Sequence, residues 1–126
     1  MIHLDSSALI DALTGARRSG MRLRQLIHEG ERILISSIVI FEWRRGPRTP
    51  DELSDQEALF PTSESIPFGP AEAMQAADFY RMVKRPRGRE IDIAIAACAV
   101  AHNAQLWTLN PQDFKDIPNL KLLSAR

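Results

Sequence analysis

Short apolar segments alternate with helix-like segments along this chain of 126 residues. The apolar segments lie at residues 2–4, 32–35, 66–68, 106–109 and 120–123. Alternation of strands and helices predicts an α/β fold with a parallel sheet, because consecutive parallel strands need a crossover that a helix can supply. We therefore expect helices on both faces of the sheet and right-handed crossovers.

Helices are predicted in the intervening segments. Their expected spans are residues 8–15, 21–29, 36–46, 51–60, 70–84 and 90–103, with a short helical turn at 110–114. Gly15 and Gly30 suit helix C-termini, and Ser36 or Ser37 suits the N-cap of the third helix. The β-branched start of that third segment also fits a strand, so both assignments stay open for it.

Size and composition predict a single domain covering residues 1–126. With 44% apolar residues, the chain can bury one core without disulfides. Its one cysteine, Cys98, has no internal partner, so we expect a reducing, cytoplasmic environment. The first residues lack a basic leader, and no apolar run reaches the roughly 20 residues of a membrane span. Export and membrane insertion are therefore not expected.

The charge balance argues against a strongly basic nucleic-acid-binding protein. Sixteen basic and sixteen acidic side chains give a formal net charge of zero. Divalent cations bound by several of the acids would weaken this objection, because the arginine clusters would then dominate the charge of the surface.

Four acids interrupt or directly follow apolar segments, although burying an unpaired carboxylate is costly. Asp5 follows the first predicted strand, and Glu42 lies in the helix after the second. Asp113 comes just after the strand at 106–109, and Asp92 lies in the first turn of its helix. Ligands of α/β proteins collect at the carboxyl ends of the strands, so we expect these carboxylates to gather there.

A cluster of carboxylates is a candidate site for Mg²⁺ or Mn²⁺, because all-oxygen ligands favour these ions over zinc. The histidines, His3, His28 and His102, are scattered and are expected to pack or to lie at the surface. A bound metal would support phosphodiester hydrolysis without a covalent nucleophile. Ser6 and Ser7 are therefore expected to cap a helix, with Ser6 also a candidate partner of a metal ligand.

Four motifs in order make the chain resemble the PIN-domain ribonucleases, and within them the VapC-type toxins of bacterial and archaeal toxin–antitoxin pairs. The motifs are Leu4 to Ser7, the Ser36-Ser37 to Glu42 segment followed by Gly46, the Asp92-Ile-Ala-Ile-Ala-Ala stretch, and Leu106 to Phe114. The resemblance covers nearly the whole chain, although residues 49–70 match no family pattern.

The resemblance implies a three-layer α/β/α sandwich with a central parallel sheet of about five strands. It implies RNA endonuclease activity, with Asp5, Glu42, Asp92 and Asp113 as catalytic ligands of Mg²⁺ or Mn²⁺. Asn110 would orient Asp113 or a metal-bound water. It also implies a homodimer and inhibition by a cognate antitoxin, which would insert a basic side chain among the acids and displace the metal.

Each acid also has a structural explanation. Asp5 can be a helix cap, Asp92 can stabilise a helix dipole, and Asp113 can be an ordinary loop acid. Glu42 can form an ion pair with an arginine among residues 44–48. Four such coincidences in the order of the family are less probable than one metal site.

Three basic clusters are candidate contacts for the RNA backbone, at residues 17–24, 44–48 and 84–89. The third has the best claim, because its loop leads into the helix of Asp92. Arg85, Arg87 and Arg89 are therefore the predicted RNA contacts, and a solvated surface is the alternative for any one cluster.

The leading hypothesis is an endoribonuclease that acts as a toxin. The alternative is a non-catalytic binding module whose acidic pocket holds metal or an arginine-bearing protein. An aspartyl-phosphate protein ranks last, because Asp5-Ser6-Ser7 lacks the second acid that such a site needs.

Overall fold

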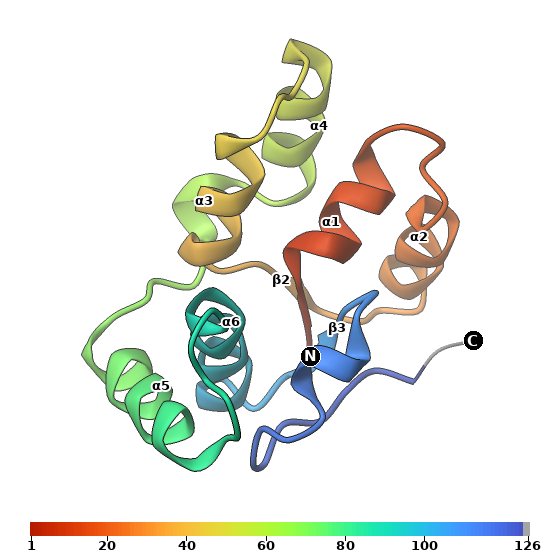
Figure 1. The fold of residues 1–126 in the computed structure, drawn as a ribbon. Helices are drawn as coiled ribbons and strands as arrows, with labels where there is room; N and C mark the ends of the chain where they lie inside the picture. Colours follow the sequence, from red (N-terminus) through yellow and green to blue (C-terminus); the bar gives the residue numbers. More distant parts are fainter. Residues whose placement is uncertain (125–126) are drawn as a thin grey trace.

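The computed structural model describes residues 1–124 and shows an α/β fold around three short parallel strands (Figure 1). The strands are β1 (Ile2–Leu4), β2 (Ile33–Leu34) and β3 (Gln105–Trp107), in the spatial order β2-β1-β3. Both neighbours pair with β1 in parallel. All residues of β1 are buried, which fits a central strand covered on both faces.

The prediction of about five strands is wrong, because the described residues form three strands and two isolated parallel bridges. Ile66 bridges Ser36 beside β2, and Leu122 bridges Leu106 beside β3. Each bridge lies where a fourth or fifth strand was expected, at one of the two edges of the sheet. Pro67 limits the first bridge, because proline has no N–H to continue a ladder of hydrogen bonds.

The second bridge is limited to the neighbourhood of one residue of β3. The Leu106 N–H donates to the Lys121 carbonyl, and the Leu123 N–H donates to the Leu106 carbonyl, each at 2.8 Å. A single pair of hydrogen bonds aligns a segment beside the sheet, but a strand needs a continued run of them.

Six α-helices and two 3₁₀ helices complete the described fold. They are α1 (Ser6–Leu13), α2 (Gly20–His28), α3 (Ser37–Arg45), α4 (Pro50–Leu59), η1 (Thr62–Glu64), α5 (Pro70–Met82), α6 (Glu90–Ala101) and η2 (Pro111–Phe114). Figure 1 shows α5 and α6 together on one side of the strands, and α1 and α2 on the other. The predicted helices on both faces are confirmed, and the segment open to either assignment is the helix α3.

Local capping explains where several helices begin and end. The Ser36 hydroxyl accepts a hydrogen bond from the Val39 N–H at 3.4 Å at the start of α3. Thr49 and Glu52 form a capping box at the start of α4, whose first residue is a proline. Gly30, which follows α2, has a φ of +87°, a conformation that glycine adopts without strain.

Helix α6 forms the centre of the core beside the sheet. Every residue of α6 from 93 to 99 is buried. The small alanine side chains in this segment let neighbouring elements approach the helix closely. Cys98 lies within this run, and burial raises the pKa of its thiol to about 11, as expected for an unreactive packing residue. No helix among residues 1–124 is both long enough and apolar enough to span a membrane.

His3 is a fully buried polar residue in the middle of β1. Neither ring nitrogen has a hydrogen-bond partner within the described residues. Burial lowers the pKa of His3 from 6.5 to about 4, so the folded protein keeps the ring neutral where the unfolded chain takes up a proton.

The free energy of unfolding is therefore expected to fall as the pH falls from 6.5 to 4. The difference between the two pKa values of His3 corresponds to about 3 kcal/mol over this whole range. A His3→Leu variant lacks this titration, and every other titrating group is common to both proteins. Urea unfolding at pH 7 and pH 4.5 should show a larger loss of stability in the wild type. Equal losses would contradict a buried neutral His3.

Candidate active site

Asp5 occupies the carboxyl end of the central strand and is only 4% exposed. Its Oδ1 accepts a hydrogen bond from the Ser6 N–H at 2.9 Å, which caps α1. Its Oδ2 accepts from the Thr108 hydroxyl at 2.7 Å and from the Ser7 hydroxyl at 2.9 Å. These three donors hold the Asp5 carboxylate in one orientation and stabilise its charge.

Thr108 and Ser7 also tie the chain after β3 to Asp5. The Asn110 N–H donates to the Thr108 hydroxyl at 3.0 Å, and the Leu109 N–H donates to the Ser7 hydroxyl at 3.0 Å. These roles of Thr108 and Ser7 were not predicted from the sequence. The role of Thr108 could have been predicted from its position. It is a hydroxyl residue directly after β3, which pairs in parallel with β1, so it leaves the sheet at the same edge as Asp5.

Glu42 projects from α3 and is 15% exposed. The Ser6 hydroxyl donates to its Oε1 at 2.6 Å, so Ser6 contacts an acid of the predicted set. Arg45 Nη2 donates to its Oε2 at 3.1 Å, and the Arg45 guanidinium lies over the Phe41 ring. The arginine partner considered in the sequence analysis is therefore present beside the contact with Ser6.

Asp92 lies in the first turn of α6 and is partly buried. Its pKa is raised from 3.8 to about 6, first by burial and then by the negative charges of Asp5, Glu42 and Asp113. The positive charge of Arg89 partly opposes this rise. The other three predicted acids therefore lie near enough to Asp92 to act on its charge.

Asp113 lies in η2 and is exposed. Its N–H donates to the Asn110 carbonyl at 3.0 Å, so these two residues are joined through the backbone. The predicted role of the Asn110 side chain in orienting Asp113 or a water stays a prediction.

The chemistry of these side chains fits a hard divalent cation. Four carboxylates provide only oxygen ligands, and a cation would offset the negative charges that, after burial, contribute to the raised pKa of Asp92. Within residues 1–124, no three histidine, cysteine, aspartate or glutamate side chains are close enough to hold one ion together. The carboxylates are thus the donor type that Mg²⁺ or Mn²⁺ prefers, but in this arrangement they do not form a ready coordination site; Asp5, with three hydrogen-bond donors, is the most firmly held of them.

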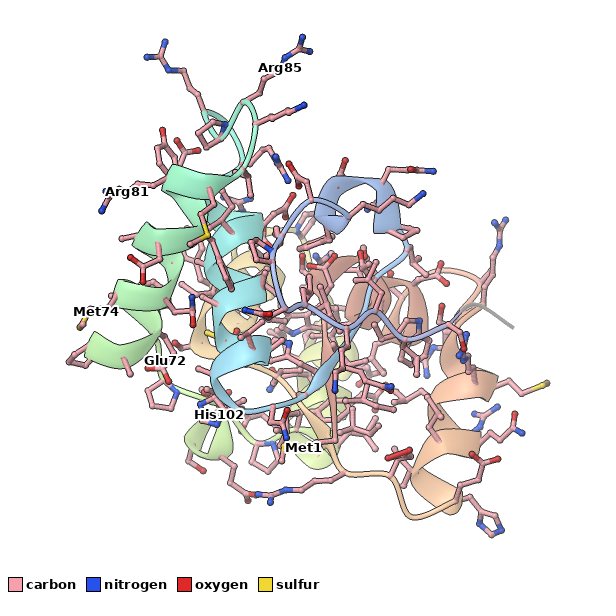
Figure 2. The ribbon with its side chains drawn as sticks, turned by 90° about the horizontal axis from the view of Figure 1, so that it is seen from below. Met1, Glu72, Met74, Arg81, Arg85 and His102 are labelled. Carbon is pink, nitrogen blue, oxygen red and sulfur yellow. The ribbon has the colours of Figure 1, made fainter. Side chains whose placement is uncertain are left out.

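The predicted RNA contacts lie in the loop between α5 and α6 and differ in their surroundings. Figure 2 shows Arg85 at the projecting tip of this loop. Arg85 and Arg87 are exposed and form no ion pair within the described residues. Arg89 is 22% exposed, and its Nη2 lies 2.6 Å from Asp116 Oδ1.

The sequence and the fold place the chain in a known family. A model of the PIN domain matches residues 2–120, and the chain belongs to the PIN-domain family. Ribonuclease VapC19 of Mycobacterium tuberculosis is 30% identical over 125 residues, which cover 94% of this chain and 95% of that relative.

Two solved structures with 25% sequence identity share the fold. A chain of VapBC2 from Rickettsia felis, bound to a DNA fragment from its promoter, matches with a TM-score of 0.74 over 100% of both chains. A chain of a toxin–antitoxin complex from Klebsiella pneumoniae matches with a TM-score of 0.70 over 95% of both chains.

Replacing Thr108 by valine is expected to destabilise the protein by about 1–2 kcal/mol, because Asp5 loses a donor and the Asn110 N–H loses its acceptor. Thr108→Ser keeps the hydroxyl and serves as the matched control. Urea unfolding at pH 7 measures both changes. If the serine variant lost as much stability as the valine variant, the hydrogen bonds of the hydroxyl would not be the cause.

Proposed function

We propose that this chain is a metal-dependent endoribonuclease that acts as the toxin of a toxin–antitoxin pair. The observation that carries the proposal is that Ser6 joins Asp5 and Glu42 by hydrogen bonds at the carboxyl edge of a PIN-domain sheet, close enough for their charges, with that of Asp113, to act on Asp92. The 30% identity to a ribonuclease over nearly the whole chain supports RNA as the substrate.

Each carboxylate has a distinct part in this proposal. Asp5 would be the fixed ligand, since three donors hold it before any cation binds. Glu42, Asp92 and Asp113 would be the further ligands, and a cation would offset the negative charges that, after burial, raise the pKa of Asp92. Mg²⁺ or Mn²⁺ at this edge would lower the pKa of a bound water and stabilise the charge that develops on the phosphate.

Arg85 and Arg87 are the proposed contacts for the RNA backbone. Both are exposed, and both lie in the loop that leads into α6, which carries Asp92. Arginine side chains that form no ion pair within the protein are available to phosphate groups. Contacts with phosphates supply affinity without base specificity.

An antitoxin protein is the proposed regulatory partner, on the likeness to chains of the VapBC2 and Klebsiella complexes. A homodimer is also proposed, and α5 offers exposed apolar side chains for it. Met74 is 70% exposed and Met82 is 65% exposed. Figure 2 shows Met74 pointing away from the body of the protein.

A non-catalytic binding module is the second candidate, favoured by the contact between Arg45 and Glu42. This contact within α3 places a guanidinium group beside one carboxylate of the edge. A protein partner that presents an arginine would find the same chemistry, and no cleavage would be required.

Cleavage of cellular RNA by the purified protein tests the proposal. We expect discrete fragments with Mg²⁺ or Mn²⁺ and none with a chelator. Asp92→Asn is expected to lower the rate by more than about 100-fold, since even residues that only support metal ligands cost about 10–100-fold. Asp78→Asn, an exposed acid on α5, is the matched control and should cleave like the wild type.

Thermal unfolding shows whether the Asp92 variant is folded. Without metal at pH 8, Asp92→Asn should be more stable than the wild type by about 1 kcal/mol, allowing for solvent screening, because the cost of burying a charge at this position and the repulsion by the other acids are both gone. The raised pKa of Asp92 means that this difference disappears as the pH falls through 6 toward 3.8. A folded wild type that binds metal but cleaves no RNA would favour the binding module.

A further inference from the structure

Arg89 was predicted to contact RNA, but its guanidinium group already forms four hydrogen bonds within the protein. Its Nη1 donates to the Lys84 carbonyl at 2.9 Å and to Asp116 Oδ2 at 3.1 Å. Its Nη2 donates to the Asp113 carbonyl at 2.9 Å and to Asp116 Oδ1 at 2.6 Å. Each terminal nitrogen of a guanidinium carries two hydrogens, so these four contacts account for all of them.

The pairing of Arg89 with Asp116 is bidentate and stabilises the charged form of both side chains. Hydrogen bonds from Arg89 lower the pKa of Asp116, and the hydrogen bonds to Asp116 raise the pKa of Arg89. Two parallel charge-assisted hydrogen bonds fix the geometry of the guanidinium plane as well as its charge. A phosphate group would have to break this pairing in order to bind Arg89.

The contacts of Arg89 join three segments that surround the acidic edge. Arg89 is the N-cap of α6, three residues before Asp92. The Lys84 carbonyl belongs to the loop after α5, and Asp113 and Asp116 belong to η2 and the residues after it.

The loop itself is turned tightly before it reaches the helix. The Arg89 N–H donates to the Pro86 carbonyl at 2.9 Å, and Gly88 has a φ of +87°, as required in a type II turn. Backbone and side chain of Arg89 therefore both limit how the loop can move relative to α6.

We propose that Arg89 is a positioning residue that holds η2, and with it Asp113, against the start of α6. It does not contact RNA, in contrast to the expectation from its sequence cluster. The bond to the Asp113 carbonyl acts on the backbone of that acid, and Asp116 provides the charge that keeps the guanidinium in place. The kinetic consequence of this proposal rests on the proposed nuclease function, and its structural consequence does not.

Asp116 distinguishes positioning from RNA contact, because a carboxylate does not bind phosphate. Under the proposal, Arg89→Met and Asp116→Ala should each lower kcat for RNA cleavage about 10–100-fold with little change in KM. The double variant should be no worse than Arg89→Met, since the contact that Asp116→Ala removes is already lost in Arg89→Met. Arg87→Gln, at a proposed RNA contact in the same loop, should instead raise KM and weaken its salt dependence.

Hydrogen exchange of the free protein gives a second measurement that needs no activity. Amides of residues 112–116 should exchange faster in Arg89→Met and Asp116→Ala, and at the rate of the wild type in Arg87→Gln. If the wild type cleaved no RNA, the proposed function would fail, and exchange would still decide the role of Arg89.

The opposite pattern would overturn the proposal. It consists of an Asp116→Ala variant with the kcat and the exchange rates of the wild type, beside an Arg89→Met variant with a raised KM. Arg89 would then be a contact for RNA, and its pairing with Asp116 would have no consequence for the site.

Discussion

The parallel pairing of β1 with both of its neighbours is the constraint on which the acidic edge depends. Leu4 pairs with Trp107, so the next residues along the two strands, Asp5 and Thr108, leave the sheet side by side. The Thr108 hydroxyl can then reach the Asp5 carboxylate at 2.7 Å. Short strands suffice for this purpose, because the register of a few residues already determines which side chains meet at the edge.

The four carboxylates of the edge differ in how many hydrogen bonds and ion pairs offset their negative charge. Asp5 accepts three hydrogen bonds, and Glu42 is shared between Ser6 and Arg45. Asp92 has a raised pKa, first because it is partly buried and then because of the charges of the other three acids. Functional sites commonly retain such unfavourable electrostatics, because the binding of a ligand relieves them. We therefore expect the pKa of Asp92 to respond to a cation.

Periodicity and capping were sufficient to predict most of the fold from the sequence. The helices and the three strands of the sheet lie close to their expected spans, because apolar spacing and residues such as Ser36 and Gly30 act locally. The two edge segments were predicted as strands, yet they form single bridges. Apolar character shows that a segment is buried near a sheet, but it does not show how many hydrogen bonds the segment can share with it.

The candidate site was predictable as a set of acids, but its supporting contacts were not. Arg89 and Asp116 are 27 residues apart in sequence, and Ser7 and Leu109 are 102 apart. Such contacts depend on where side chains from separate elements point, which no local pattern encodes. Arg89 shows the consequence most clearly: a basic cluster suggests phosphate binding, while the structure gives this arginine an acid and two carbonyls as partners.

The titration of Asp92 followed by carboxyl NMR, with and without Mg²⁺, tests most directly whether the acids form one cation site. The account predicts a pKa of about 6 without the ion and a marked fall when Mg²⁺ is saturating, because the cation replaces repulsion by attraction. An Asp92 that titrates near 4 under both conditions would show that the carboxylates neither repel one another nor share an ion, and would contradict the account.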